Sequence, residues 1–146
     1  CGTNEELRDE LESQDDKPTL THVLGYENRV DALMELADVV ITKAGGITTS
    51  EALAKRLPMV LFDPIPGQEW GNAAYLTGTG AALLAEEARE AVELAAEILD
   101  NSGLAANMRG AAESLAEPDA ACSVASMALE LSKKPVERLA GEAAGG

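Results

Sequence analysis

The sequence predicts an α/β fold, a doubly wound, Rossmann-like parallel sheet followed by C-terminal helices. Three observations support this prediction. Short apolar segments alternate with segments of helical periodicity, the order of a parallel sheet with helical crossovers. The segment Pro58–Asp63 is largely apolar, as expected of a strand covered on both faces. From Glu86 onward the apolar residues recur only at helical spacing.

The first elements follow from local signals. Thr3-x-x-Glu6 forms a capping box and predicts a helix over Asn4–Gln14, which the run Asp15–Pro18 ends. Thr19–Leu24 is predicted as a short strand ending at Gly25-Tyr26. Apolar residues at helical spacing then indicate a short amphipathic helix: Val30, Leu33, Met34 and Ala37.

The middle of the chain carries the strongest strand signals. Asp38–Thr42 is rich in β-branched residues and predicts a buried strand, and a Gly-Gly turn leads from it into a helix. The elements expected here, in order, are the strand Asp38–Thr42, the helix Thr49–Arg56, the strand Pro58–Asp63, the helix Gln68–Leu76 and the strand Ala81–Leu84.

The last third of the chain is predicted to be helical. Capping and breaking residues divide it into three helices, Glu86–Leu99, Ser102–Leu115 and Pro118–Ser132. Lys133–Gly146 is rich in Ala, Gly and Glu and is predicted to be a flexible tail. No internal repeat is visible.

Composition limits the classes of function. The 146 residues suit one domain with a real core, and the formal net charge is −15. Nucleic-acid binding needs a basic face, so we expect none, and the same charge disfavours contact of this segment with an anionic membrane. The acidic residues are spread over helices such as Glu5–Asp16 and Glu86–Glu97, which predicts solvated faces. A local diphosphate pocket is compatible with this charge.

Cysteines and hydropathy indicate the compartment. Cys1 and Cys122 make neither a disulfide framework nor a zinc motif, so a reducing, cytoplasmic setting is expected. No apolar run has the length of a membrane span, and no signal peptide is visible. The sequence begins with Cys1-Gly2 in mid-pattern, so we expect it to be part of a longer protein.

The segment Asp38–Glu51 predicts an anion site. Its order is strand, glycine turn and helix start, and the free N–H groups of a first helical turn attract phosphate. Thr48, Thr49 and Ser50 add hydroxyl groups, and Lys43 adds a cation. The alternative is plain turn chemistry with Thr48 or Thr49 as the N-cap. The segment is neither a P-loop nor a Gly-x-Gly-x-x-Gly fingerprint.

A second loop supports the binding interpretation. Prolines stiffen Pro64–Gly67, so Gln68 and Glu69 have little conformational freedom to lose when they contact a ligand. The hydrogen-bond donors and acceptors of these two side chains suit the hydroxyls of a sugar. Taken alone, this pair could simply open a surface helix. Four segments, however, follow predicted strand ends, where ligands bind in such sheets: Cys1–Asn4, Gly25–Asn28, Lys43–Glu51 and Asp63–Asn72.

These segments together resemble one family. The matching motifs, in order, are Cys1-Gly-x-Asn4, Leu24-Gly-Tyr26, Ile41-Thr-Lys-Ala-Gly-Gly-x-Thr-Thr-Ser-Glu51, Leu57-Pro-Met-Val-Leu-Phe-Asp-Pro-Ile-Pro-Gly-Gln-Glu69 and Asn72-Ala-x-Tyr-Leu76. The chain resembles the C-terminal, donor-binding half of monogalactosyldiacylglycerol synthases and processive diacylglycerol glucosyltransferases, which have the glycosyltransferase-B fold. It is also similar to the N-acetylglucosaminyltransferase that completes the lipid-linked peptidoglycan precursor. The resemblance covers about residues 1–132.

The resemblance implies a role for each motif residue. Thr48 and Thr49, with the backbone at Gly45 and Gly46, would hold the diphosphate of UDP. Lys43 would offset the charge of the leaving group. The ribose hydroxyls would be bound by Glu51, since a carboxylate accepts two such hydrogen bonds well.

The same resemblance covers the base and the sugar of the donor. Gly25 and Tyr26 would flank the uracil. Gln68 and Glu69 would contact the donor sugar, and Asn72 would support that loop. The family uses no donor-site metal, so neither a metal nor a cofactor is expected.

Two positions depart from the family pattern. Arg56 stands where relatives usually have a glycine, so left-handed backbone and some strain are expected there. Trp70-Gly71 replaces a more polar pair, and Trp70 would either shield the sugar site or pack, packing being preferred. His22, the only histidine, is expected to be structural.

The implied organisation is a UDP-sugar-binding domain over residues 1–132 without its first strand. The N-terminal acceptor domain, with the lipid site, the membrane-binding surface and the catalytic base, would precede it. The fragment alone is therefore expected to transfer no sugar.

The implied activity of the whole protein is transfer of a hexose from UDP-glucose or UDP-galactose to a lipid such as diacylglycerol. It would be a peripheral protein on the cytoplasmic face of the cell membrane, or on a plastid envelope. Alternatives are transfer of N-acetylglucosamine to the peptidoglycan precursor and a non-catalytic UDP-sugar-binding module. A UDP-sugar epimerase of the same fold would need acid and base residues that we do not find. The Gln68-Glu69 pair favours the glycolipid.

Overall fold

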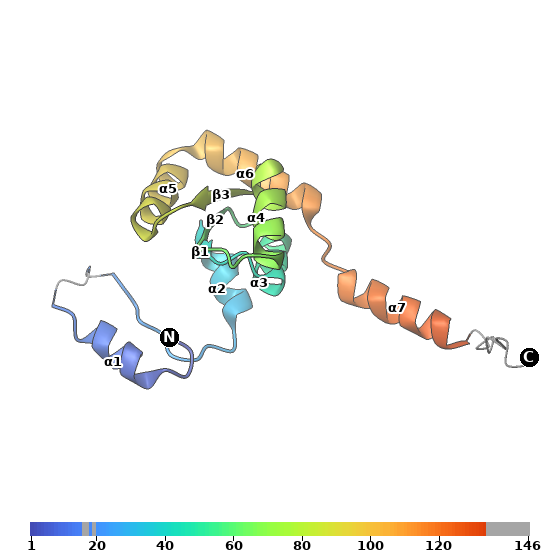
Figure 1. Ribbon diagram of the computed structural model, residues 1–146, viewed down its shortest axis with the longest axis horizontal. Helices are drawn as coiled ribbons and strands as arrows, with labels where there is room; N and C mark the ends of the chain where they lie inside the picture. Colours follow the sequence, from blue (N-terminus) through green and yellow to red (C-terminus); the bar gives the residue numbers. More distant parts are fainter. Residues whose placement is uncertain (16–17, 19, 134–146) are drawn as a thin grey trace, which may run out of the picture.

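The computed structural model describes residues 1–15, 18 and 20–133 (Figure 1). The predicted tail falls, apart from Lys133, outside the described residues. The elements are α1 (Glu5–Glu12), α2 (Val30–Leu36), β1 (Val40–Thr42), α3 (Gly46–Ala54), β2 (Met59–Phe62), α4 (Gln68–Gly78), β3 (Ala82–Ala85), α5 (Ala88–Asp100), α6 (Ser102–Leu115) and α7 (Ala120–Lys133).

The three strands form one parallel sheet in the order β1-β2-β3. Val40 pairs with Met59, and Met59 pairs in turn with Ala82. The helices α3 and α4 connect successive parallel strands, as βαβ units require. The predicted parallel α/β fold is confirmed.

The central strand β2 divides the core into two halves. Because side chains alternate along a strand, Met59 and Leu61 enter one cluster while Val60 and Phe62 contact the other. Helices α3 and α4 contribute to the first cluster, and α5 and the start of α6 contribute to the second. Helices therefore cover both faces of the sheet, and burying each large apolar side chain contributes roughly 1.5–3 kcal/mol.

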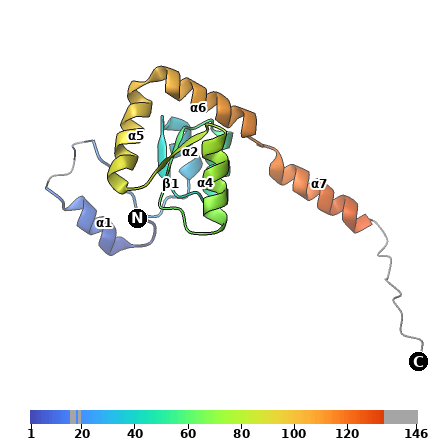
Figure 2. The ribbon, with the colours of Figure 1, turned by 45° about the horizontal axis from the view of Figure 1, so that its top comes forward.

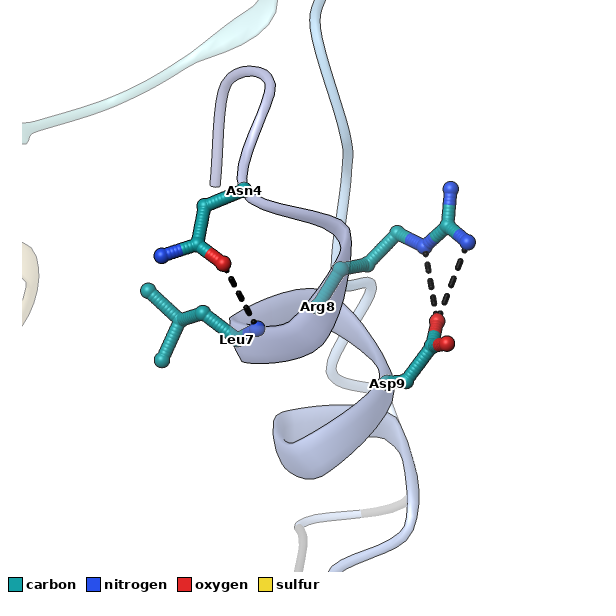
Figure 3. Close-up of polar contacts among 4 residues, drawn as sticks. All are labelled: Asn4, Leu7, Arg8 and Asp9. Atoms are coloured by element: carbon teal, nitrogen blue, oxygen red, sulfur yellow. Dashed lines mark hydrogen bonds and ion pairs between the residues drawn. The ribbon is translucent and has the colours of Figure 1, made fainter.

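Helix α1 begins at Glu5, one residue later than predicted. The N-cap is Asn4, whose Oδ1 accepts a 2.9 Å hydrogen bond from the N–H of Leu7 (Figure 3). The capping box on Thr3 is therefore wrong, because the Asn4 side chain takes the capping position instead. On the next turn, Arg8 donates to Asp9 from Nε and Nη2 at 3.2 and 3.0 Å (Figure 3).

The strand predicted over Thr19–Leu24 is wrong for the part that the structure describes. Residues 21–24 have no regular secondary structure, and Thr19 lies outside the described residues. The N–H of Thr21 donates to Pro18, and the Cys1 ammonium donates to the carbonyl of Leu24 at 3.0 Å. A strand needs a neighbour for its ladder, and none of the three described strands pairs with this segment.

Arg56 has the left-handed backbone that the sequence predicted, with φ 52°. The N–H of Leu57 bonds to the carbonyl of Ala52, and that of Arg56 bonds to Leu53. This is a Schellman motif in which Arg56 takes the position that glycine favours. Leu57 and Ala52 are both buried and complete the hydrophobic contact of the motif.

Helix α7 projects away from the sheet and its covering helices in both views (Figures 1 and 2). None of its residues is buried. Over the described ranges, no helix combines the length and the apolar character needed to cross a membrane.

Candidate functional site

The carboxyl ends of the three parallel strands lie along one edge of the sheet, and two of the four candidate segments leave from this edge. Lys43 follows β1, Asp63 follows β2 and Glu86 follows β3. The structure therefore brings the segments 43–51 and 63–72 together at this edge, as predicted from the strand order.

Helix α3 starts three residues earlier than predicted. Gly46 is its first residue and Gly45 its N-cap, so neither Thr48 nor Thr49 is the N-cap. Gly45 offers no side-chain acceptor, and the first helical bond runs from the N–H of Thr49 to its carbonyl at 3.0 Å. The N–H groups of Gly46, Ile47 and Thr48 precede that bond and remain available to an anion.

The hydroxyl groups in the first turns of α3 differ in whether they bond to the helix backbone. Thr49 is 5% exposed and donates to the carbonyls of Gly45 and Gly46 at 2.9 and 3.3 Å. Ser50 donates to Gly46 at 2.7 Å. Ser and Thr inside helices often donate backwards in this way. The half-exposed Thr48 hydroxyl makes no hydrogen bond to the part of the chain that the structure describes.

Lys43 forms an ion pair with Asp63, with Nζ 3.3 Å from Oδ2. Both side chains are largely exposed, and Asp63 has φ 47°, a left-handed conformation that Asp tolerates. Asp63 was not among the site residues predicted from the sequence. Its place directly after a buried strand, one strand over from Lys43, is the signal that could have identified it.

Gln68 and Glu69 are the first two residues of α4. Glu69 accepts a 2.8 Å hydrogen bond from the N–H of Ile65 through Oε2, so it fixes the shape of the proline loop. Gly67, the N-cap, has φ 110°, which requires glycine. Gln68 is exposed, and unlike Glu69 it makes no hydrogen bond to the proline loop, whose residues the structure describes throughout.

Asn72 joins the two segments. Its Nδ2 donates a 2.9 Å hydrogen bond to the carbonyl oxygen of Ala44, just before the glycine turn. A Cβ at Gly46 would lie 4.0 Å from the same nitrogen. A cavity of about 200 Å³ lies between α3 and α4, lined by Gly46, Thr49, Ser50, Leu53, Asn72, Tyr75 and Leu76.

The remaining predicted contacts lie apart from this cavity. Glu51 is exposed on α3 and is not among the residues that line it. Gly25 lies beside Arg8, since a Cβ at this glycine would be 3.7 Å from Nη1, and Tyr26 is 77% exposed. The proposed uracil contacts therefore stay a prediction.

A second cavity, of about 360 Å³, lies at the ends of β2 and β3. Its lining residues are Asp63, Pro64, Trp70, Leu84, Ala85 and Glu86. Trp70 is half-exposed rather than packed in the core. Among the residues that the structure describes, no three His, Cys, Asp or Glu side chains converge as metal ligands. The expected lack of a metal or cofactor stays a prediction.

These features define a Rossmann-like domain in which the N-terminus of α3, with no side-chain cap, lies at the carboxyl ends of the strands. Residues 1–125 match the model of the glycosyltransferase family 28 C-terminal domain, and the chain belongs to this family.

Curated relatives agree with this assignment. The chain is 38% identical over 108 residues to a processive diacylglycerol beta-glucosyltransferase of Staphylococcus carnosus, covering 74% of this chain and 28% of the relative. It is 36% identical over 131 residues to the protein of that name from Bacillus cytotoxicus, covering 89% and 34%. The chain thus spans about a third of the length of the curated relatives it matches.

Proposed function

We propose that the chain is the donor-binding half of a glycosyltransferase that moves a hexose from a UDP-sugar to a lipid such as diacylglycerol. The observation that carries the proposal is the hydrogen bond from Asn72 to the carbonyl of Ala44. It holds the open N-terminus of α3 against α4, which begins with Gln68 and Glu69. A diphosphate bound at the N-terminus of α3 would then place its sugar toward the start of α4.

The diphosphate is bound by backbone N–H groups rather than by a cluster of cations. Gly46 and Thr48 donate from the first turn of α3, where the helix dipole favours negative charge. Thr48 adds its hydroxyl, and Lys43 offsets the remaining charge. Thr49 supports the turn through its bonds to Gly45 and Gly46.

The rest of the donor extends in two directions from the diphosphate. Glu51, on α3, accepts hydrogen bonds from the ribose hydroxyls. The segment at Gly25 and Tyr26 flanks the uracil. The Gln68 amide both donates hydrogen bonds to the hexose hydroxyls and accepts them, and the Glu69 carboxylate accepts them. UDP-glucose and UDP-galactose are the candidate donors.

The reaction is an attack by the acceptor hydroxyl on the anomeric carbon. The new bond forms to that carbon while its bond to the β-phosphate oxygen breaks, and UDP leaves with the electron pair. Lys43 and the helix N-terminus stabilise the charge that develops on UDP. The acceptor's proton passes to a base in a domain outside this chain, and no metal or cofactor is needed for the step.

The names of the relatives support a glycolipid product, because each is called a diacylglycerol glucosyltransferase. We infer that the whole protein acts at the cytoplasmic face of the cell membrane, held there by a domain outside this chain. The chain itself has a net charge of −15, which disfavours direct contact with an anionic lipid surface.

The test is UDP binding by calorimetry with Glu51→Ala. Loss of the ribose acceptor is expected to weaken binding by about 1–3 kcal/mol. Glu97→Ala, an exposed carboxylate on α5, is the matched control and should leave affinity unchanged. Equal affinities for all three proteins would refute the site. Assays of the longer protein with UDP-glucose, UDP-galactose and UDP-N-acetylglucosamine then identify the donor.

A further inference from the structure

The ion pair between Lys43 and Asp63 connects the two sides of the proposed donor site. Strands β1 and β2 are parallel neighbours, with Thr42 paired to Leu61, so the residues after them leave the sheet side by side. Lys43 leads into the glycine turn before α3, and Asp63 leads into the proline loop Pro64–Gly67 before α4. The 3.3 Å contact between Nζ and Oδ2 therefore joins the diphosphate side to the sugar side.

The ammonium group of Lys43 is able to change partners. Its side chain is 51% exposed and that of Asp63 is 66% exposed, so burial holds neither group in place. Lysine carries a compact charge on a flexible four-carbon stem. A diphosphate carries at least two negative charges, so at equal distance it attracts the ammonium about twice as strongly as the single carboxylate does. A diphosphate at the N-terminus of α3 therefore takes Lys43 from Asp63.

The proline loop connects Asp63 to the start of α4. Asp63 has φ 47° and Gly67 has φ 110°, so the loop lies between two residues with left-handed backbone. Residues at the ends of elements absorb the φ/ψ changes when a loop shifts. The N–H of Ile65 donates to Oε2 of Glu69 at 2.8 Å, which ties the loop to the first turn of α4. A displacement at Asp63 therefore reaches that turn.

The strength of the pair suits an exchange of partners. An exposed ion pair of this kind changes an equilibrium by no more than about fivefold. Such a pair biases the position of the loop, yet a ligand with a larger charge breaks it.

We propose that Asp63 is a positioning residue, which keeps Lys43 and the proline loop in one arrangement until a diphosphate takes Lys43. The loop and the first turn of α4 then shift, and this shift brings Gln68 to the donor hexose. The diphosphate of the nucleotide thereby prepares the contacts to its own sugar. The inference rests on the proposed function, because the diphosphate site supplies the ligand that breaks the pair.

The fluorescence of Trp70, the only tryptophan in the chain, tests the proposal. Its indole is half-exposed in the first turn of α4 and lines the same cavity as Asp63. We expect UDP to cause a saturable change in emission, whereas uridine, which has no phosphate, causes none. High salt should shift the emission of the unliganded protein in the same direction as UDP, because salt weakens an exposed ion pair.

The variant Asp63→Asn removes the partner of Lys43. Without ligand, its emission should already match that of the UDP-bound protein, and UDP should change it no further. Its affinity for UDP, measured by calorimetry, should rise about two- to fivefold. Asp63→Gly also lacks the carboxylate and suits the left-handed backbone, so it should behave in the same way.

The control variant is Glu86→Gln. It removes the other carboxylate that lines the cavity beside Trp70 and leaves the Lys43–Asp63 pair intact, so its emission should respond to UDP as that of the unchanged protein does.

Two results would overturn the inference and leave the donor site in place. One is a UDP-induced change in emission that is equal in Asp63→Asn and in the unchanged protein. The other is a response to uridine equal to the response to UDP. Calorimetry on the same preparations tests the donor site itself, and an absence of UDP binding there would refute the proposed function and, with it, the role of Asp63.

Discussion

The amide nitrogen of Asn72 lies 2.9 Å from the carbonyl oxygen of Ala44 and donates a hydrogen bond to it. The two residues are 28 positions apart, on α4 and on the turn before α3. Ala44 is fully buried, so its carbonyl has little access to water. This single contact fixes the distance between the helix start that would bind a diphosphate and the helix start that would bind a sugar.

Removing this contact should affect both stability and binding. Asn72→Ala leaves the Ala44 carbonyl without its donor, and we expect the free energy of unfolding to fall by about 1–3 kcal/mol and UDP affinity to fall with it. Asn72→Asp should be at least as harmful, since a carboxylate cannot donate. Urea denaturation and calorimetry measure the two effects. Gln68→Ala, exposed on the same helix, should leave stability unchanged, and a loss there equal to that of Asn72→Ala would contradict the assignment.

The two threonines of α3 should separate binding from stability. Thr49→Val removes a buried hydroxyl that bonds Gly45 and Gly46, so the free energy of unfolding is expected to fall by roughly 0.5–1.5 kcal/mol. Thr48→Val removes a half-exposed hydroxyl and should instead weaken UDP binding by a similar amount. Both are measured on the same preparations by urea denaturation and calorimetry. Identical behaviour of the two variants would show that the hydroxyls have no distinct roles.

The Lys43–Asp63 ion pair should oppose binding of a diphosphate. Asp63→Asn leaves Lys43 in place without its partner, and Asn tolerates the left-handed backbone at this position. We expect UDP affinity to rise by about 0.5–1 kcal/mol at low salt, the magnitude of an exposed pair, and the gain to shrink at high salt. Lys43→Met should lower affinity. A decrease in affinity for Asp63→Asn would mean that Asp63 itself assists the ligand.

The left-handed backbone at Arg56 predicts a stabilising substitution. Arg56→Gly removes a conformational penalty of about 1–2 kcal/mol, part of which is offset by the greater freedom of glycine in the unfolded chain. We therefore expect a net gain of roughly 0.5–1 kcal/mol in urea denaturation. Arg56→Ala keeps the strain and breaks only the exposed pair with Glu113 at 3.4 Å. If alanine stabilised as much as glycine, the backbone would not be the cause.

The pair between Lys55 and Glu35 predicts a small effect of alkaline pH. The 2.7 Å hydrogen bond to Glu35 raises the pKa of Lys55 above 10.5, and the charges of Glu35 and Asp31 add to it. Because the folded pKa is raised, the pair stabilises fully below the unfolded pKa and loses its effect as pH rises through the folded value. The difference in Tm between the protein and Lys55→Met should thus shrink above pH 10.5. In a Glu35→Gln background, the difference should not depend on pH in this way.

Local patterns predicted most of the fold correctly. The β-branched run before Lys43 and the apolar run after Pro58 form the strands β1 and β2, and the left-handed backbone at Arg56 was expected. Local sequence could not predict whether residues 19–24 form a strand, because a strand exists only where a neighbouring strand shares its hydrogen bonds. Its amino acids favour extended backbone, but in the described residues no strand pairs with it.

The sequence by itself determined the parallel α/β architecture and the placing of a glycine turn and a Gln-Glu helix start at strand ends. Those features depend on the spacing of apolar residues and on residues adjacent in the chain. Only the tertiary structure decided that α3 opens at Gly46, that Asn72 holds Ala44 and that Asp63 faces Lys43. Each of the two contacts joins groups that are distant in the chain, and the packing of helices on the sheet sets the distance between them.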